Sequence, residues 1–234
     1  MIALILWTLL AGAAIPVGGA LAAIEHVRPR WLENELRHTV IAFGGGVLLS
    51  AVALVLVPDG SEPVAVWAAP LLLVVGGLGF MGLDILLARR SGAGSQVAAM
   101  LADFIPEAVA LGATFVADRK SGVFLAVLIA LQNLPEGFNA FREIRSASTA
   151  RTRSLLLAFS CLALLGPACG VVGHFLLDSD SATLGAIMLI AGGGILYLTF
   201  EDIAPQAKLS KAFAPPMGAV LGFSVGLIGH LLAA

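Results

Sequence analysis

Eight runs of about 20 mostly apolar residues take up most of this chain, and they limit its fold more than any other feature. The runs lie at about 2–24, 39–57, 64–87, 97–117, 121–141, 154–177, 182–202 and 212–233. Only 12% of the residues are charged, about half of what soluble domains carry. We therefore expect an all-α membrane protein whose eight transmembrane helices form a single domain. The first run should be a true span, because it is too long for a signal peptide and no basic residue precedes it.

The basic residues alternate between loops in a way that predicts the orientation of the chain. Of the 13 lysines and arginines, 11 follow the odd-numbered runs: Arg28, Arg30, Arg37, Arg89, Arg90, Arg142, Arg145, Arg151, Arg153, Lys208 and Lys211. The even-numbered loops hold Arg119 and Lys120 together with Asp59, Glu62, Asp118, Asp178 and Asp180. We expect odd-numbered loops in the cytoplasm, both termini on the periplasmic side, and an inner-membrane location. The few basic residues lie in short loops, which argues against nucleic acid as a partner.

An internal repeat relates the two ends of the chain. The second run contains GGGVLLSAVALVLVPDG from Gly44, and the seventh contains GGGILYLTFEDIAPQA from Gly192. Because these runs are five spans apart, they would cross the membrane in opposite directions, which is typical of transporters with inverted repeats. Glycine runs also occur in membrane helices simply for close packing. The repeat predicts a 3+2+3 arrangement, with residues 1–90 and 154–234 as inverted halves and 97–141 between them.

The two middle runs carry the same polar pattern. The fourth reads DFIPEAVALG from Asp103, and the fifth reads QNLPEGFNAF from Gln132. Asp103 and Glu107 are four residues apart, as are Gln132 and Glu136, so each pair shares one face of its helix. Each helix therefore offers a stripe of oxygen atoms near the middle of the membrane.

A proline precedes the glutamate in both runs. Pro106 and Pro135 have no N–H, so the carbonyl oxygens of Ala102 and Leu131 lose their usual helical partner. Such oxygens must be satisfied by a neighbour, by water or by an ion. The prolines therefore add backbone oxygen atoms to the same region.

Three carboxylates and two amides in this region suit a divalent cation. The candidate ligands are Asp103, Glu107, Gln132, Asn133 and Glu136. Oxygen ligands favour harder ions, whereas nitrogen ligands would favour zinc more strongly. The alternative is that the glutamates reach the membrane surface or pair within the bundle for structural reasons. Ionisable groups inside a membrane are candidates for function by default.

At these residues the sequence resembles the ZIP family of divalent metal transporters. The family's fourth span reads His-Asn-x-Pro-Glu-Gly, where this chain has Asp103, Phe104, Ile105, Pro106, Glu107 and Ala108. Its fifth span reads His-Glu-x-Pro-His-Glu, or Gln-Asp-x-Pro-Glu in some bacterial members, where this chain has Gln132, Asn133, Leu134, Pro135 and Glu136. The resemblance covers most of the chain. It implies eight spans, external termini, metal ligands on the fourth and fifth spans, and movement of spans 1, 4, 5 and 6 against spans 2, 3, 7 and 8.

The chain departs from the family pattern at three ligand positions, the first being Asp103 in place of the histidine. Phe104 cannot bind a metal, and Gly166 stands before Pro167 where some members have a glutamate. A binuclear site would therefore be reduced to a single-metal site of Asp103, Glu107, Gln132 and Glu136, with Asn133 at its edge. A release path could run past Asp84, Glu201 and Asp202, although interfacial carboxylates are also ordinary.

We expect a transporter that moves a divalent cation such as zinc, iron, manganese or cadmium into the cytoplasm by alternating access. The cation would be a substrate, with no prosthetic group. The partners would be the lipid bilayer and, as an open possibility, a second copy in a homodimer. The alternative is a membrane protein of the same fold that binds or senses metal, or acts as a partner subunit, without transport. The sequence contains no HExxH or Gly-x-Gly-Asp motif, so we do not expect an enzyme.

Overall fold

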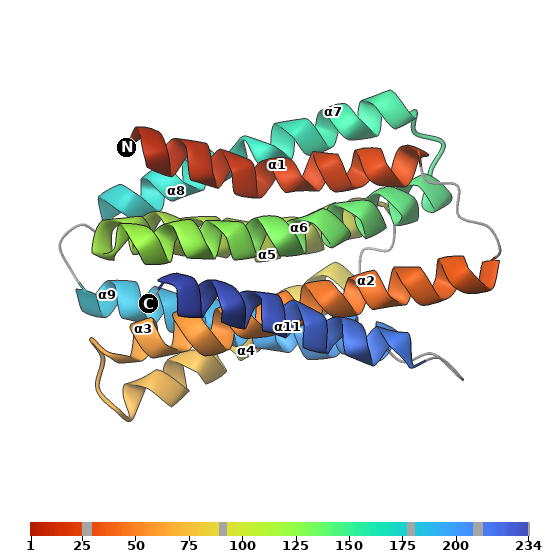
Figure 1. Ribbon diagram of the computed structural model, residues 1–234. Coiled ribbons are helices and arrows are strands. Elements are labelled where there is room, and N and C mark those ends of the chain that lie inside the picture. The colour runs from red at the N-terminus through yellow and green to blue at the C-terminus, as the bar shows by residue number, and fades with distance from the viewer. Residues whose placement is uncertain (25–29, 89–92, 177–180, 208–212, 234) are drawn as a thin grey trace.

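The computed structural model describes residues 1–24, 30–88, 93–176, 181–207 and 213–233, and every regular element in that part of the chain is a helix (Figure 1). The elements are α1 (Ile2–Ile24), α2 (Arg30–Ala51), η1 (Val52–Leu56), α3 (Val57–Ser61), α4 (Ala68–Ala88), α5 (Ala93–Ala117), α6 (Arg119–Ala147), α7 (Thr152–Ala163), α8 (Leu165–Leu176), α9 (Ser181–Leu198), η2 (Thr199–Ile203), α10 (Ala204–Gln206) and α11 (Ala214–Ala233). The elements η1 and η2 are single π-helical turns.

The apolar runs form membrane-length helices, as the sequence predicts. In the described ranges, 7 helices or continuous helix pairs are long and apolar enough to cross a membrane. The remaining predicted run lies in α5, whose apolar part covers Phe104–Val116. The chain is therefore a multi-pass helical membrane protein. The 3+2+3 arrangement and the side on which the termini lie remain predictions.

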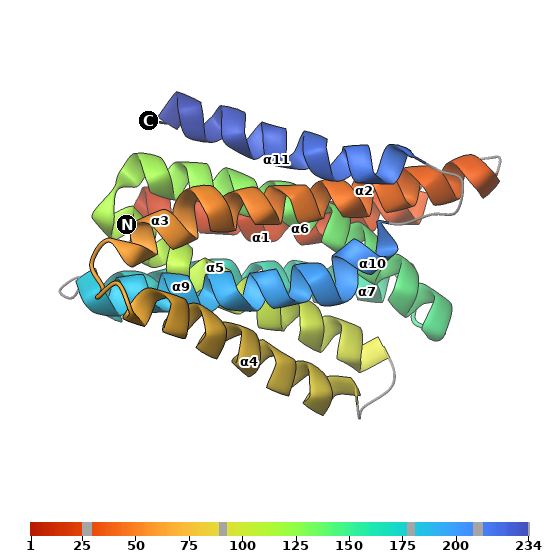
Figure 2. The same ribbon diagram turned by 90° about the horizontal axis from the view of Figure 1, so that it is seen from below.

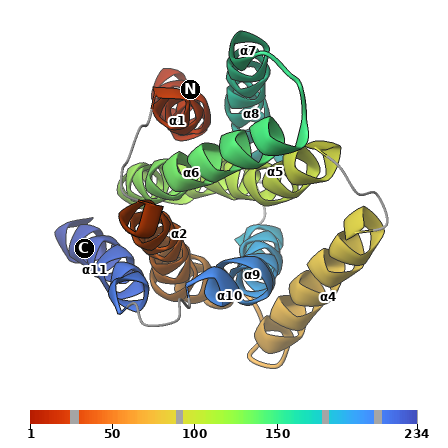
Figure 3. The same ribbon diagram turned by 90° about the vertical axis from the view of Figure 1, so that its right-hand side faces the viewer.

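The helices pack as two groups, best seen along the bundle in Figure 3. In the first group, which we call the α1 group, α1 packs mainly on α6, and α5 packs on α8, with α7 beside α1. In the second, the α2 group, α2 packs mainly on α11 and α4 packs on α9. The α2 group also includes η1, α3, η2 and α10. The main contacts between the groups are those of α2 with α6 and of α5 with α9.

Glycines bring backbones together inside each group. A Cβ atom at each of eight glycines would overlap a backbone carbonyl of the packed helix: Gly18 and Gly137 between α1 and α6, Gly112 and Gly173 between α5 and α8, Gly46 and Gly222 between α2 and α11, and Gly76 and Gly193 between α4 and α9. In each of these four pairs, each helix thus contributes one glycine that packs on the backbone of the other helix. Gly44 and Gly229 instead face the other group, and they meet side-chain atoms of Pro135 and Phe124. Small residues allow such close approach of membrane helices.

Several helix limits differ from the sequence prediction. The polar segments 25–38 and 142–153 were expected to be loops, but α2 begins at Arg30 and α6 continues to Ala147. The expected span 154–177 is two helices, because α7 ends at Ala163 and the chain turns at Leu164, before Pro167. Pro167 has no N–H for the carbonyl oxygen of Ala163, which removes one helical hydrogen bond at the break.

Each half of the chain contains a π-helical turn at the same distance from a proline. In η1 the N–H of Val57 donates to the carbonyl oxygen of Val52, and in η2 the N–H of Ala204 donates to that of Thr199. The next residue is a proline in both cases, Pro58 and Pro205. The two turns therefore interrupt α2 and α9 in the same way (Figure 2 shows both helices from below).

Candidate functional site: a buried carboxylate–amide pair between α5 and α6

Pro106 and Pro135 lie inside α5 and α6, and neither one ends its helix. Both helices continue for ten or more residues beyond the proline because packing on neighbouring helices supports them. Pro135 is buried, and its ring packs against Gly44 of α2, where a Cβ would lie 3.0 Å from Cγ. Each proline thus lacks the N–H that would normally bond the carbonyl oxygen one turn upstream.

Glu107 of α5 and Gln132 of α6 meet between these helices. Their side chains are 4% and 0% exposed. The Gln132 amide nitrogen Nε2 donates to both carboxylate oxygens of Glu107, at 2.6 Å to Oε1 and 2.7 Å to Oε2. The structure therefore brings together two of the five candidate ligands, one from each Pro-Glu motif.

The other atom of the Gln132 amide, Oε1, is buried and accepts no hydrogen bond. Buried polar atoms are nearly always satisfied, so an unpaired one calls for a partner such as water or an ion. The nitrogen and oxygen of an amide exchange places when the group turns over. Turning the Gln132 amide would point Oε1 at Glu107, and the two side chains could then hold a cation between their oxygens.

Of the other candidate ligands, Asn133 is the one whose contacts with another helix are described. Asn133 is fully buried but faces α1, where its Nδ2 donates to the carbonyl oxygen of Ala11 at 2.9 Å, and its Oδ1 has no partner. Glu136 is half-buried on α6, one turn from Gln132. Asp103 belongs to α5, but its side chain lies outside the described residues.

Phe104 of α5 packs between α1 and α8. Its ring is 1% exposed, and its Cζ atom lies 3.0 Å from the positions that a Cβ would take at Gly12 and at Gly166. A larger residue at Gly166 would also approach the carbonyl oxygen of Thr8, at 2.5 Å. The ring and the two glycines thus fit one another, and they fill this space with apolar atoms.

The three residues of the predicted release path lie at one end of the bundle, with Glu201 close to both of the others. Asp84 of α4 accepts a hydrogen bond from the Tyr197 hydroxyl, 3.1 Å from Oδ2. Glu201 is close enough to interact electrostatically with Asp84. Asp202 interacts with Glu201 and also with Glu143 of α6.

Glu143 and Arg37 are charged residues near this end that the sequence analysis did not propose. Arg37 of α2 lies 3.8 Å from Glu143 of α6, an ion pair between the two helix groups. Gln132, Glu136, Asn139 and Glu143 are spaced by four, three and four residues, so they share one face of α6. That spacing was the signal in the sequence that could have identified Glu143.

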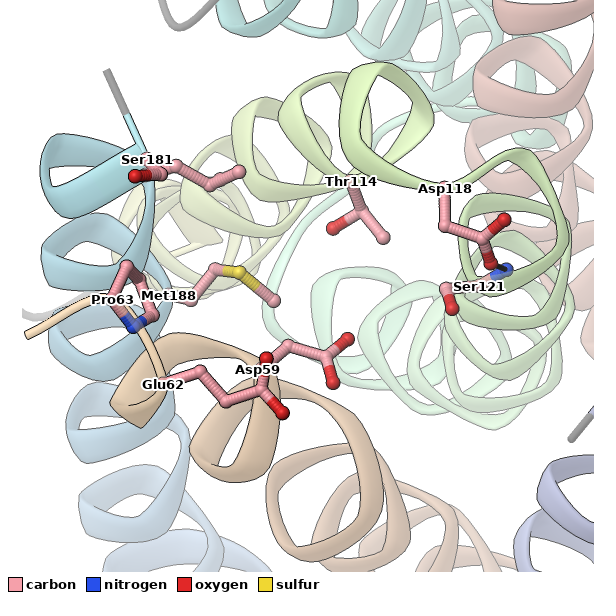
Figure 4. A pocket seen from close by; sticks show the side chains of 9 residues that line it. Asp59, Glu62, Pro63, Thr114, Asp118, Ser121, Ser181 and Met188 are labelled. Atoms are coloured by element: carbon pink, nitrogen blue, oxygen red, sulfur yellow. Dashed lines mark hydrogen bonds between the residues drawn. The ribbon is translucent and has the colours of Figure 1, made fainter.

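A pocket of about 480 Å³ lies at the opposite end of the bundle, where α9 begins (Figure 4). Its walls come from α3 and the turn that follows, from the junction of α5 and α6, and from the start of α9. The lining residues are Asp59, Glu62, Pro63, Thr114, Asp118, Ser121, Ser181, Leu184 and Met188. Its three carboxylates are residues that the sequence analysis assigned to the acidic, even-numbered loops.

Asp118 in this pocket caps the start of α6. Its Oδ2 accepts a hydrogen bond from the Ser121 N–H at 2.7 Å. This bond, with further bonding to the Ser121 side chain, holds the pKa of Asp118 below its ordinary value of 3.8. Asp118 therefore stays ionised near neutral pH, so this wall of the pocket is negatively charged.

In the part of the chain that the structure describes, no group of three or more His, Cys, Asp and Glu side chains is arranged to hold a metal ion. The Glu107–Gln132 pair is not a group of this kind, because it has only two members and one of them is an amide. Comparison of the chain with models of known protein families gives no match. Comparison with curated proteins gives no match either.

Proposed function

We propose that this protein is a transporter that carries a divalent transition-metal cation into the cytoplasm by alternating access. The observation that carries the proposal is the buried Glu107–Gln132 pair between two proline-containing helices. An ionisable group is costly inside a membrane, and groups of this kind mark ion pathways. The unpaired Oε1 of Gln132 adds an oxygen that a cation would satisfy.

The acidic groups at the two ends of the bundle support a path through this site. The pocket with Asp59 and Asp118 lies where α9 begins at Ser181. From there α9 runs to Leu198, so η2 with Glu201 and Asp202 lies about 27 Å away at the other end. With the orientation predicted from the basic residues, the pocket would face the periplasm and η2 the cytoplasm.

The packing of the helices supports the proposed division into two moving parts. In the predicted repeat, spans 1 and 6 correspond, as do spans 2 and 7, 3 and 8, and 4 and 5. The close backbone contacts follow this correspondence, since α1 with α6 matches α8 with α5, and α2 with α11 matches α9 with α4. These contacts lie inside the groups, whereas Gly44 and Gly229 meet side chains of the other group. The α1 group could therefore move against the α2 group as a unit.

The resemblance to ZIP transporters points to zinc, iron, manganese or cadmium as the class of substrate. The test is uptake of radioactive metal into proteoliposomes containing the full chain. Glu107→Ala and Glu136→Ala should abolish uptake, whereas Ser160→Ala, on an exposed face of α7, should leave it unchanged. Uptake that survives both glutamate substitutions would rule out the site.

A second candidate function is favoured by Phe104. Its packed ring stands at a position where ZIP transporters have a metal ligand. The protein would then bind or sense metal without transporting it. Titration calorimetry separates the two candidates when it is combined with uptake. Metal binding without uptake would identify a binding protein, and binding with uptake a carrier.

A further inference from the structure

We propose that the π-helical turn η1 is a hinge and that α3, which follows it, is a lid over the acidic pocket. The lid would consist of α3 and the turn after it, residues 57–63. This inference concerns the motion of the chain and does not depend on which solute the protein carries.

The first step is the repetition of the π turn. The residues before the two prolines, VALVLV directly after α2 and TFEDIA directly after α9, share almost no side-chain chemistry. Their backbones nevertheless make the same turn, which begins six residues before each proline. What the two halves have in common is thus the backbone geometry, and π turns are frequent at functional sites.

The second step is the weakness of the helix at this point. A π turn contains one residue more than an α turn and interrupts the regular hydrogen-bond ladder. Pro58 follows at once and has no N–H to donate to the carbonyl oxygen of Leu54. The helix axis is therefore easiest to bend between Val52 and Pro58, and α3 is the part that would move.

The third step is the position of α3 at the pocket. Asp59, Glu62 and Pro63 form one wall, and Thr114 with Asp118 forms part of the other (Figure 4). Thr114 is only 2% exposed, although its side chain lines the pocket. Any outward swing of α3 would widen the pocket and expose Thr114.

The fourth step is the surface on which α3 rests. Gly60 of α3 lies against Gly185 of α9, and a Cβ at Gly185 would lie 2.5 Å from the carbonyl oxygen of Gly60 and 2.6 Å from Cγ of Pro63. Since neither glycine has a side chain, the two backbones touch directly, with the side chains of Pro63, Met188 and Leu189 beside them. The contact holds the lid closed by close packing and leaves it free to lift.

The experiment measures how fast a membrane-impermeant maleimide reacts with Thr114→Cys in the full chain, purified into nanodiscs after Cys161→Ala and Cys169→Ala. Gly185→Ala should push α3 outward and raise the rate about fivefold, because it favours local opening. Pro58→Ala restores an N–H at the hinge, so it should lower the rate about fivefold. Gly79→Ala is the matched control, since nothing lies within 4 Å of a Cβ there, and it should leave the rate unchanged.

A second reporter separates lid motion from unfolding. Thr8→Cys lies in α1 outside the pocket and is fully buried, so it should react equally slowly in all three backgrounds unless the protein unfolds. The lid is overturned if neither Gly185→Ala nor Pro58→Ala changes the Thr114→Cys rate, or if Gly79→Ala changes it as much. Should Gly185→Ala fail to fold, the Pro58→Ala result alone decides: a slower rate supports the hinge, and an unchanged rate refutes it.

Discussion

At the scale of single residues, the molecule depends on how one buried carboxylate is satisfied. Glu107 receives both hydrogen bonds of the Gln132 amide group, and hydrogen bonds to a charged group are stronger than those between neutral groups. The same amide leaves its oxygen unpaired. The pair is therefore stable enough to be buried, and it still has an unused acceptor for a ligand.

This pairing predicts different effects for its two members. Gln132→Leu removes the amide donor from the buried carboxylate and should lower the free energy of unfolding by about 2 kcal/mol. Glu107→Gln leaves two amides that can still bond to each other, and it should change the free energy by less than about 1 kcal/mol. Both substitutions should abolish metal binding. Thermal unfolding in detergent together with titration calorimetry checks this, and equal stability of the two variants would contradict it.

Asp118 makes a prediction about pH. Its pKa is lower in the folded protein than in the unfolded chain because of the bonds from Ser121. Its cap therefore stabilises the start of α6 fully above pH 4, and the effect is lost as the pH falls through the lowered pKa. Asp118→Ala should cost at most about 1 kcal/mol at pH 7, since the side chain is exposed to water.

Asp118→Asn is the matched variant, because asparagine caps a helix as well as aspartate does but does not titrate in this range. It should keep the stability of the first turn of α6 at pH 7 and remove its loss in acid. Hydrogen exchange of the amides in that turn, followed from pH 7 to pH 3, measures both effects. An acid loss of the same size in Asp118→Asn would show that another group is responsible.

At the scale of helices, apolar length predicted most of the elements correctly. It placed the spans, with Pro106 and Pro135 inside two of them. The Pro-Glu motifs predicted one site of five residues, and of these Glu107 and Gln132 meet in the structure. It did not predict that α2 starts at Arg30, because that first turn is polar and amphipathic and so does not register as an apolar run. A π turn has no residue signature, since it differs from an α turn by one inserted residue, and η1 and η2 were therefore invisible in the sequence.

Glycine contacts give a prediction at the same scale. A Cβ at Gly112 of α5 would overlap the backbone of Gly170 in α8, so Gly112→Ala should force the helices apart and cost about 3 kcal/mol. Gly79→Ala in α4 meets nothing within 4 Å, and it should leave stability unchanged or raise it by up to about 1 kcal/mol through helix propensity. Unfolding in a denaturing detergent compares the two. Similar losses in both variants would show that glycine packing is not what joins α5 to α8.

At the scale of the whole molecule, the backbone contacts divide the bundle into two groups that meet mainly through side chains. The candidate site belongs wholly to the α1 group, because both α5 and α6 are in it. The acidic pocket has walls from both groups, and so does the opposite end, where Arg37 of α2 pairs with Glu143 of α6. If the groups move against each other, the two ends change their width while the site itself keeps its ligands.

A covalent link between the groups should therefore stop transport, and a link within a group should not. Arg37→Cys with Glu143→Cys joins α2 to α6 across the groups, where the native side chains already meet at 3.8 Å. Thr39→Cys with Met217→Cys joins α2 to α11 inside the α2 group, beside the contact of Gly218 with Thr39. After reaction with a short cleavable bis-maleimide, radiometal uptake should be lost in the first pair, recover on cleavage, and persist in the second. Because both links are anchored on α2, near one end of the bundle, uptake that persists in the first pair would mean that the groups do not move as units.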